Sequence, residues 1–251
     1  MIPRKLIENY TQGINGISKA SRAALKAALE SIDFSQPVDV VRDLVIEVMQ
    51  SVCGASTDAA AALSAEFYDG LREMEIGQRM GAAATSGRDA QATDGAVRAF
   101  AEKLVKGNAK AFVNLCLERV DYETKVAAAQ TCLENAKRDR KKPMFARVPT
   151  GAETCDFCLM LASRGFVYHT EAAASHTHSG CDCRVIPSWR SQSVEGYDPD
   201  ALYNEWQNMI DEKAAKRAVR NDTTADEERQ NIMNAYGQAA KAAKLRKKAS
   251  K

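Results

Sequence analysis

Aromatic residues make up only 6% of this chain of 251 residues, and glycine occurs 14 times. Alanine, by contrast, recurs in runs throughout the sequence. Because alanine is the strongest helix former and glycine one of the weakest, this composition favours a mainly helical protein. No stretch approaches the roughly 20 consecutive apolar residues that a membrane-spanning helix needs, so we expect no membrane partner.

Neither sign of charge dominates the sequence. Lys and Arg total 35 and Asp and Glu total 33, which leaves a net charge of +2. Bulk electrostatics alone therefore do not indicate a nucleic-acid-binding protein. The first residues, Met-Ile-Pro-Arg-Lys-Leu-Ile-Glu, also lack the apolar segment of an export signal. We expect a reducing, cytosolic environment, in which paired cysteines hold metal more often than they form disulfides.

Three of the seven cysteines stand apart from the others. Cys53, Cys116 and Cys132 fall at apolar positions of segments with helical periodicity. A cysteine in such a position usually behaves as a small hydrophobic side chain. We predict that all three are buried and have no catalytic role.

Residues 1–140 show helical periodicity almost throughout. We predict one helix over residues 18–32, a second over residues 38–52 and a third that starts at Ser56. The second is expected to open with Ser35 as its N-cap and a proline in its first turn. The apolar stripes of these segments predict the core of a helix bundle rather than a groove for a ligand.

Residues 81–94 are rich in Gly, Ser, Thr and Ala and lack periodicity, which is typical of a connection. The helical pattern returns over residues 96–137. This stretch is either one long helix or two helices with a break near Gly107 or Asp121. Both alternatives are compatible with the sequence.

A charge-dense segment at residues 138–143 ends the helical region. After it come β-prone stretches at residues 145–148, 165–168 and 183–187. The change in character predicts a small α+β module, which we place at residues 144–190.

Asp198-Pro199-Asp200 is predicted to cap a further helix that runs toward Arg217. The sequence from residue 225 onward is again alanine-rich and helical in pattern. It ends in a basic tail, which contains Lys241, Lys244, Arg246, Lys247, Lys248 and Lys251. We expect this tail to fray.

Four of the cysteines and two of the three histidines are gathered within 29 residues. Their pattern is Cys155-x-x-Cys158, then His176-x-His178-x-x-Cys181-x-Cys183. Thiolates and imidazoles together are the donors that a tetrahedral Zn²⁺ prefers. The C-x-x-C pair fits a tight knuckle loop, and cysteines two residues apart on a strand point to the same side.

These donors outnumber the four positions around a zinc ion. The preferred ligands are Cys155, Cys158, His178 and Cys181. Cys183 competes most strongly with this set and His176 more weakly. Reduced thiols without metal and a catalytic zinc are the alternatives, but a catalytic zinc keeps one position open and a surplus of donors argues against that. We predict a structural zinc that holds together a module without a large core of its own.

The predicted fold is therefore mainly α and has three regions. An N-terminal helical region spans residues 1–140, and a small α+β module held by zinc spans residues 144–190. C-terminal helices with a basic tail occupy residues 198–251.

One motif with an enzymatic meaning must be considered. His169-Thr170-Glu171 matches the H-x-E of zinc deaminases, but in those enzymes the P-C-x-x-C lies downstream of it. Here the C-x-x-C lies upstream and no proline precedes it. The sequence also contains no nucleophile elbow, P-loop or dinucleotide fingerprint. We expect no catalytic residues and no enzymatic activity.

Two segments around the cysteines carry a family resemblance. They are Arg147-Val148-Pro149-Thr150-Gly151, continuing through the C-x-x-C pair to Gly165, and His178-x-x-Cys181-x-Cys183-Arg184-Val185-Ile186-Pro187. Together they resemble the phage Mu F-like minor head protein family, in the form found in tailed phages and prophages of Gram-positive hosts. Residues 59–72 are similar to the helical region that precedes the module in that family. The matches span about residues 55 to 190, and the module at 147–187 is the more specific part.

The resemblance implies a minor capsid protein that is present in few copies at the portal vertex of the virion, and in the host cytoplasm during assembly. Its partners would be the portal protein and capsid or scaffold proteins, and it would act in head assembly and in DNA packaging or ejection. Some members carry a fused protease or toxin domain, of which this sequence has no signature. His176 departs from the family pattern and leaves the ligand set open.

Nucleic acid enters these hypotheses in two ways. The tail residues Lys244, Arg246, Lys247 and Lys248 could contact packaged DNA through phosphate charge, although a solvated, disordered end is the alternative. A second functional hypothesis is a cytosolic zinc-dependent protein that reads nucleic acid with its zinc module. Such a reader needs basic and aromatic residues around the metal. The sequence offers few of them: Arg164, Arg184, Trp189 and Arg190.

Overall fold

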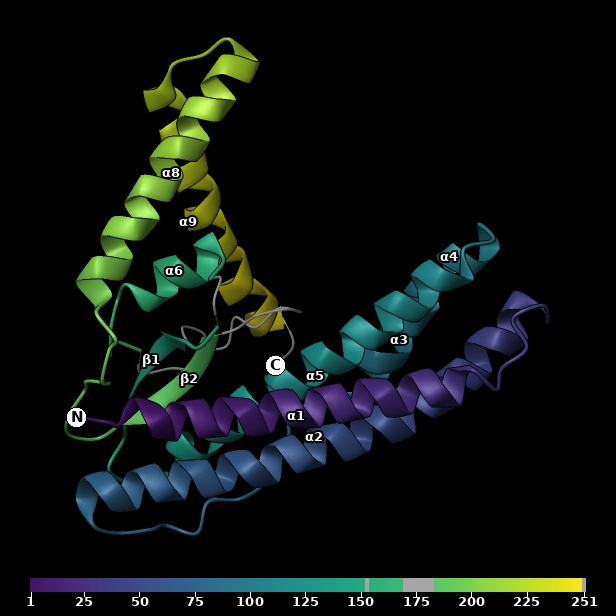
Figure 1. Ribbon diagram of the computed structural model, residues 1–251, viewed down its shortest axis with the longest axis horizontal. Helices are drawn as coiled ribbons and strands as arrows, with labels where there is room; N and C mark the ends of the chain where they lie inside the picture. Colours follow the sequence, from purple (N-terminus) through teal and green to yellow (C-terminus); the bar gives the residue numbers. More distant parts are fainter. Residues whose placement is uncertain (152–153, 169–182, 250–251) are drawn as a thin grey trace. The chain divides into compact units, whose positions relative to one another are not determined.

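The computed structural model describes the chain apart from residues 152–153, 169–182 and 250–251, and apart from the side chains of residues 239–249. Within that part the protein is mainly helical with a small antiparallel sheet, as predicted (Figure 1). It divides into two compact units. The N-terminal unit comprises Pro3–Lys142, and the C-terminal unit comprises Met1–Ile2 and the described residues from Pro143 onward.

Three long helices build the N-terminal unit: α1 (Arg4–Leu29), α2 (Val38–Ile76) and α5 (Ala109–Arg138). Each of them packs against the other two. The short helices α3 (Ala90–Phe100) and α4 (Glu102–Val105) pack on α5, and α3 also contacts α2. The unit is therefore a helix bundle.

The prediction of a new helix at Ser56 is wrong, because α2 runs unbroken through this position. The hydroxyl of Thr57 donates to the carbonyl of Cys53 at 2.8 Å, and Ser56 shares a hydrogen bond with Thr124 of α5. Hydroxyl side chains that bond back along the helix or to a neighbouring helix do not act as caps. α2 ends instead at Gly77, whose φ of 74° is left-handed, as is usual for the residue after a helix.

The start of α1 and the cap of α2 also differ from the predictions. α1 begins at Arg4 rather than at residue 18, and its first half is fixed by Tyr10, whose ring stacks on Phe67 of α2 with 3.9 Å between centroids. Ser35 does not cap α2, because its hydroxyl donates to Asp33 at 2.6 Å and Pro37 occupies the N-cap. The proline is therefore the N-cap itself and not a residue of the first turn.

The helical stretch after the connection breaks at Gly107, one of the two predicted places. Gly107 has a φ of 69°, and Asn108 follows as the N-cap of α5. Asp121 does not interrupt α5. Its carboxylate accepts hydrogen bonds from Ser18 at 2.6 Å and from Lys125 at 2.8 Å, so the charge is paired inside the bundle.

The connection itself, between α2 and α3, is held by polar side chains of the long helices. Asp69 accepts the backbone N–H groups of Met80 and Ala82 at 2.9 and 2.8 Å. Asn135 bonds both the N–H and the carbonyl of Ala83, each at 2.8 Å. An extended segment thereby finds partners for backbone groups that no sheet satisfies.

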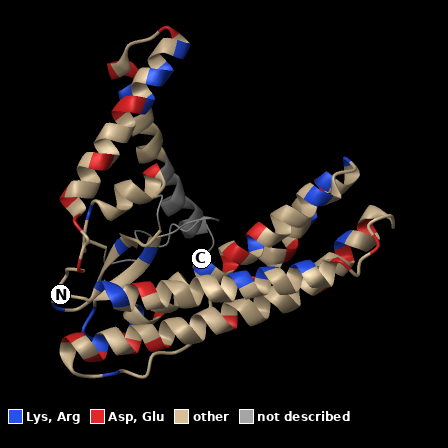
Figure 2. Cartoon of the chain, viewed as in Figure 1, with Lys and Arg blue, Asp and Glu red and all other residues tan. Residues whose placement is uncertain are grey.

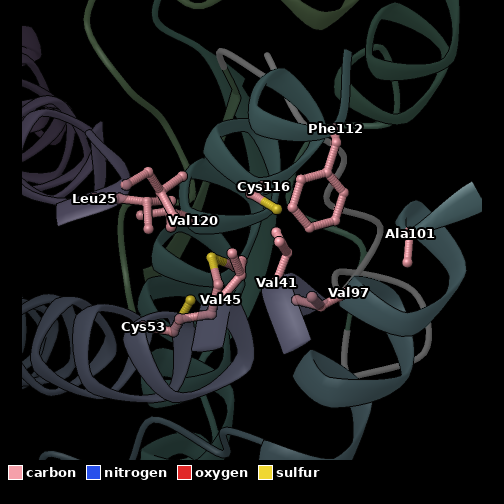
Figure 3. Close-up of a cluster of buried hydrophobic side chains, with 11 residues drawn as sticks. Leu25, Val41, Val45, Cys53, Val97, Ala101, Phe112, Cys116 and Val120 are labelled. Carbon is pink, nitrogen blue, oxygen red and sulfur yellow. The ribbon is translucent and has the colours of Figure 1, made fainter. Parts of the chain in front are cut away.

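A cluster of buried apolar side chains lies where the end of α1 meets α3 and the first parts of α2 and α5 (Figure 3). Phe112 and Cys116 of α5 point toward Val41 of α2 and Val97 of α3. The full cluster is Leu25, Leu29, Val41, Val45, Met49, Cys53, Val97, Ala101, Phe112, Cys116 and Val120. The predicted burial of Cys53, Cys116 and Cys132 is confirmed. Burial raises the pKa of Cys116 and Cys132 to about 12, so both remain neutral thiols.

In the C-terminal unit, strand β1 (Met144–Pro149) pairs with strand β2 (Cys183–Ser188) in antiparallel register. Arg147 stands opposite Val185, and Pro149 stands opposite Cys183. Of the third β-prone stretch, Tyr168 alone pairs, in an isolated bridge to Phe145. The two strands are the elements that position the cysteines.

Helices complete the C-terminal unit. α6 (Asp156–Ala162) packs on β1 and on α8 (Pro199–Asn221), which in turn packs against α9 (Ala225–Ala249). The Asp198 side chain caps α8 by accepting two backbone N–H groups at 3.0 and 3.1 Å, as predicted, and α8 continues beyond Arg217. α8 and α9 belong to the same compact unit as the sheet. None of the described helices has the length and apolar character required to cross a bilayer.

Candidate metal centre

The C-x-x-C pair lies where the chain enters α6. Cys155 is the N-cap of this helix, and its sulfur accepts the backbone N–H of Cys158 at 3.4 Å. Cys158, in the first turn, is fully buried, while Cys155 is partly exposed. The C-x-x-C pair, for which a knuckle loop was predicted, thus forms the start of α6.

Cys183 joins this pair from the first residue of β2. Its sulfur lies 3.0 Å from the sulfur of Cys158, although 25 residues separate the two in the chain. The guanidinium of Arg147, on β1, donates to the sulfur of Cys183 at 3.1 Å. Arg147 is only 1% exposed, so its positive charge is held beside the cysteines in a largely dry environment.

The sulfur separation allows more than one chemical state. A disulfide requires about 2.05 Å between sulfurs. Two thiolates that share one tetrahedral zinc at 2.3 Å lie about 3.8 Å apart. At 3.0 Å the sulfurs of Cys158 and Cys183 need to move by less than about 1 Å to reach either arrangement. The described cysteines form no disulfide with one another.

Three of the five predicted ligands are thus brought together: Cys155, Cys158 and Cys183. His178 and Cys181, together with the weaker candidate His176, lie outside the described residues. Among the residues that the structure does describe, no group of three His, Cys, Asp or Glu has the geometry of a metal site. The donor chemistry fits zinc, and a closed tetrahedral site needs a fourth donor. That donor would have to come from residues 169–182, which contain His178 and Cys181.

Asp156 connects the knuckle loop to the C-terminal helices. Its carboxylate pairs with Lys213 of α8 and accepts the hydroxyl of Tyr236 of α9 at 2.8 Å. Burial raises the pKa of Asp156, but the hydrogen bonds from Lys213 and Tyr236 outweigh it, so the pKa lies below its usual value. The residue next to Cys155 in the chain is therefore a charged anchor for two helices.

Aromatic rings surround this anchor. The ring of Tyr236 lies 6.3 Å from that of Phe157 and 6.2 Å from that of Trp206, which is in turn 5.9 Å from Tyr203. Ring pairs at such distances add about 0.5 to 1.5 kcal/mol each beyond the area that they bury. The knuckle loop and the C-terminal helices are consequently one packed structure.

Sequence reasoning missed Arg147 and Asp156 as parts of this site. In the sequence Arg147 is identified only as part of the family pattern. The available signal is that an arginine among the apolar residues of a strand needs a hydrogen-bond acceptor, and in the structure the Cys183 sulfur is that acceptor. For Asp156 the sequence carries no signal, because its partners lie 57 and 80 residues away. The four tail residues Lys244, Arg246, Lys247 and Lys248 fall on α9, in the part whose side chains are not described. His169 lies outside the described residues as well.

Comparison with known proteins yields one result. The model of one protein family, described as VG15 protein, matches residues 1–209. This range includes the whole N-terminal unit, the paired strands and the first half of α8. No curated protein and no solved structure matches the chain significantly.

Proposed function

Since the chain belongs to the VG15 protein family over most of its length, and since its cysteine module resembles that of phage Mu F-like proteins, we propose that it is a minor capsid protein of a tailed phage or prophage. In this proposal it associates with the portal vertex and acts in head assembly and in DNA packaging or ejection. Portal protein and capsid or scaffold proteins are its partners, and the virion is its destination.

One observation carries the proposal. Of the two segments that bear the resemblance, the first begins with Arg147, Val148 and Pro149 in β1, and the second ends with residues 183–187 in β2, the strand that pairs with β1. Their pairing brings Cys183 to within 3.0 Å of Cys158. A pattern of residues that folds onto itself around its own cysteines supports a common module, whereas a chance match has no reason to do so.

Zinc, when bound, would supply cross-linking rather than chemistry. Cys155, Cys158 and Cys183 would hold it, together with His178 or Cys181. Cys183 is included among the preferred ligands in this proposal, because its sulfur lies beside that of Cys158. A two-stranded sheet is marginal by itself, and a metal that ties β2 to the start of α6 would stabilise it. No catalytic role is proposed for any residue of this site.

The competing hypothesis, a zinc module that reads nucleic acid, finds less support. Two of the basic residues near the cysteines, Arg147 and Arg184, are 1% and 5% exposed. Buried guanidinium groups cannot neutralise phosphates. Arg164 and Arg190 are exposed, but two cations are few for a surface that binds nucleic acid.

Co-expression with the portal protein encoded beside this chain tests the proposal. We expect stable co-purification, with few copies of this chain per portal ring in sedimentation. The Cys158→Ser variant should lose the complex if the module contributes to the interface. The Cys132→Ser variant is the control, because Cys132 is buried in the N-terminal unit. If the wild-type protein binds neither the portal protein nor the capsid proteins, the proposal is refuted.

A further inference from the structure

The small net charge of the chain conceals a strong separation of charge within the N-terminal unit. α1 contains five basic residues and one acidic residue, a net charge of +4. α2 contains eight acidic and two basic residues, a net charge of −6. In Figure 2, blue segments recur along α1 and red segments along α2. The net charge of +2 for the whole chain therefore does not indicate which ligands the surfaces of α1 and α2 attract.

The basic residues of α1 form one stripe. Lys19, Arg22 and Lys26 are spaced by three and four residues, which places them on the same face of the helix. Lys5 lies 14 residues before Lys19, almost four whole turns, and so falls near the same line. All four side chains are exposed. From Lys5 to Lys26 the stripe is about 31 Å long, at 1.5 Å per residue.

No carboxylate among the described residues lies within ion-pair distance of Lys19, Arg22 or Lys26. Some other exposed cations of the chain do have such a partner. Lys106 pairs with Glu102 and Lys216 with Glu212, each one turn away. Uncompensated charges in a row create a local positive potential that a polyanion can use.

Apart from Glu8, which pairs with Arg4 one turn away, the residues between these cations on this face are small or neutral. Gln12, Asn15 and Ala23 are exposed on the same side, and Gly16 has open space around it. A stable protein interface usually has an aromatic or large apolar anchor at its centre and is depleted in lysine. The stripe lacks such an anchor, and exposed ion pairs with an acidic protein contribute only about 0 to 1 kcal/mol each. A nucleic acid, by contrast, gains affinity from every counterion that it releases.

We propose that the outer face of α1 is a binding surface for the phosphate backbone of double-stranded DNA, without sequence preference. A straight helix with cations along about 31 Å matches a rigid duplex, which carries one charge per about 1.7 Å. The DNA contact is thereby assigned to α1 rather than to the tail at residues 244–248. The inference goes beyond the proposed function, since it holds whether or not the chain binds a portal.

The test measures binding of the full-length protein to a fluorescent random-sequence duplex by anisotropy, at several salt concentrations. The variant Lys19→Gln, Arg22→Gln, Lys26→Gln removes three phosphate contacts, so the slope of log affinity against log salt should fall by about 2.7. Between about 50 and 200 mM salt, the loss of affinity should then be about 40-fold smaller than for the wild type. Glutamine is a good helix former, and circular dichroism would verify that α1 persists.

Three comparisons complete the test. A matched variant with the same loss of charge, Lys106→Gln, Lys110→Gln, Lys216→Gln, should keep a slope close to that of the wild type, because none of these residues lies on α1. A single strand of equal length should bind more weakly than the duplex. The variant Lys244→Gln, Arg246→Gln, Lys247→Gln should change the slope less than the α1 variant.

Three results would overturn the inference. If the α1 variant keeps the wild-type slope, or if the tail variant alone abolishes binding, the DNA contact is not on α1. If the α1 variant binds duplex normally but no longer captures the portal protein, the stripe serves an acidic protein instead. Failure of portal capture by the wild type, with DNA binding intact, would refute the proposed function and leave this inference standing.

Discussion

The two units of this chain rely on different sources of stability. In the N-terminal unit, eleven buried apolar residues from four helices share one core, so that no single contact dominates. In the C-terminal unit, a two-stranded sheet packs on α6, and Cys155, Cys158 and Cys183 meet beside it, where we propose a zinc cross-link. The packing of amphipathic helices stabilises the first unit, whereas we propose that a metal cross-link adds to the stability of the second.

The largest expected effect is the loss of this cross-link. Cys158→Ser should abolish zinc binding and unfold the C-terminal unit, because structural zinc contributes on the order of 10 kcal/mol or more to small modules. Zinc content by elemental analysis and the melting profile measure both consequences. Cys132→Ser should keep its zinc, since Cys132 lies in the other unit. Retention of one zinc per chain in Cys158→Ser would contradict the ligand assignment.

Phe112→Ala should affect the opposite unit. Phe112 is fully buried in the bundle core, and removal of such a ring typically destabilises by about 3 to 5 kcal/mol. We expect a lower melting temperature of the N-terminal unit with unchanged zinc content. If zinc were lost together with the helices, the two units would not be independent.

A buried ion pair offers a second way to weaken the N-terminal unit. Arg72 donates to Asp139 at 2.8 Å, and their side chains are 7% and 1% exposed. Asp139→Asn removes the charge that Arg72 requires, which should cost about 3 to 5 kcal/mol in chemical denaturation. The pair of Arg42 and the exposed Asp43 is the control, and Asp43→Asn should destabilise the unit much less than Asp139→Asn. Equal effects of the two variants would show that the burial of the Asp139 pair is unimportant.

The smallest expected effect concerns the anchor between α6 and α9. Tyr236→Phe removes the hydroxyl that donates to Asp156 at 2.8 Å, which should destabilise the C-terminal unit by about 1 kcal/mol. The fluorescence of Trp206, whose ring lies 6.2 Å from that of Tyr236, reports the transition. Tyr203→Phe should leave the stability of the C-terminal unit unchanged, because the Tyr203 hydroxyl makes no hydrogen bond to any described residue. A larger effect of Tyr203→Phe would exclude Asp156 as the anchor.

The sequence predicted those features that depend on local periodicity or on a nearby cap. The helical character of residues 1–140, the break at Gly107 and the Asp198 cap of α8 all follow from neighbours in the chain. The start of a helix at Ser56 was predicted wrongly for the same reason. Serine and threonine look like caps in a sequence, and only the tertiary position of Thr124 shows that Ser56 has a partner inside the bundle.

Features that depend on distant contacts could not be predicted in this way. The sequence gathers Cys155, Cys158 and Cys183 into one motif but leaves their roles open. The pairing of β1 with β2 places the Cys183 sulfur beside that of Cys158. The charge separation between α1 and α2 was also invisible in the net charge, because it requires the helix boundaries. Spacing suggests which residues can meet, and packing decides which of them do.

Hydrogen exchange of the full-length, zinc-loaded protein, followed by mass spectrometry before and after addition of a chelator, tests the central claim most directly. We predict that chelation removes protection from β1, α6 and β2 while α1, α2 and α5 stay protected. If all helices lose protection together, or if chelation changes nothing in the C-terminal unit, the two units do not differ in the way proposed here.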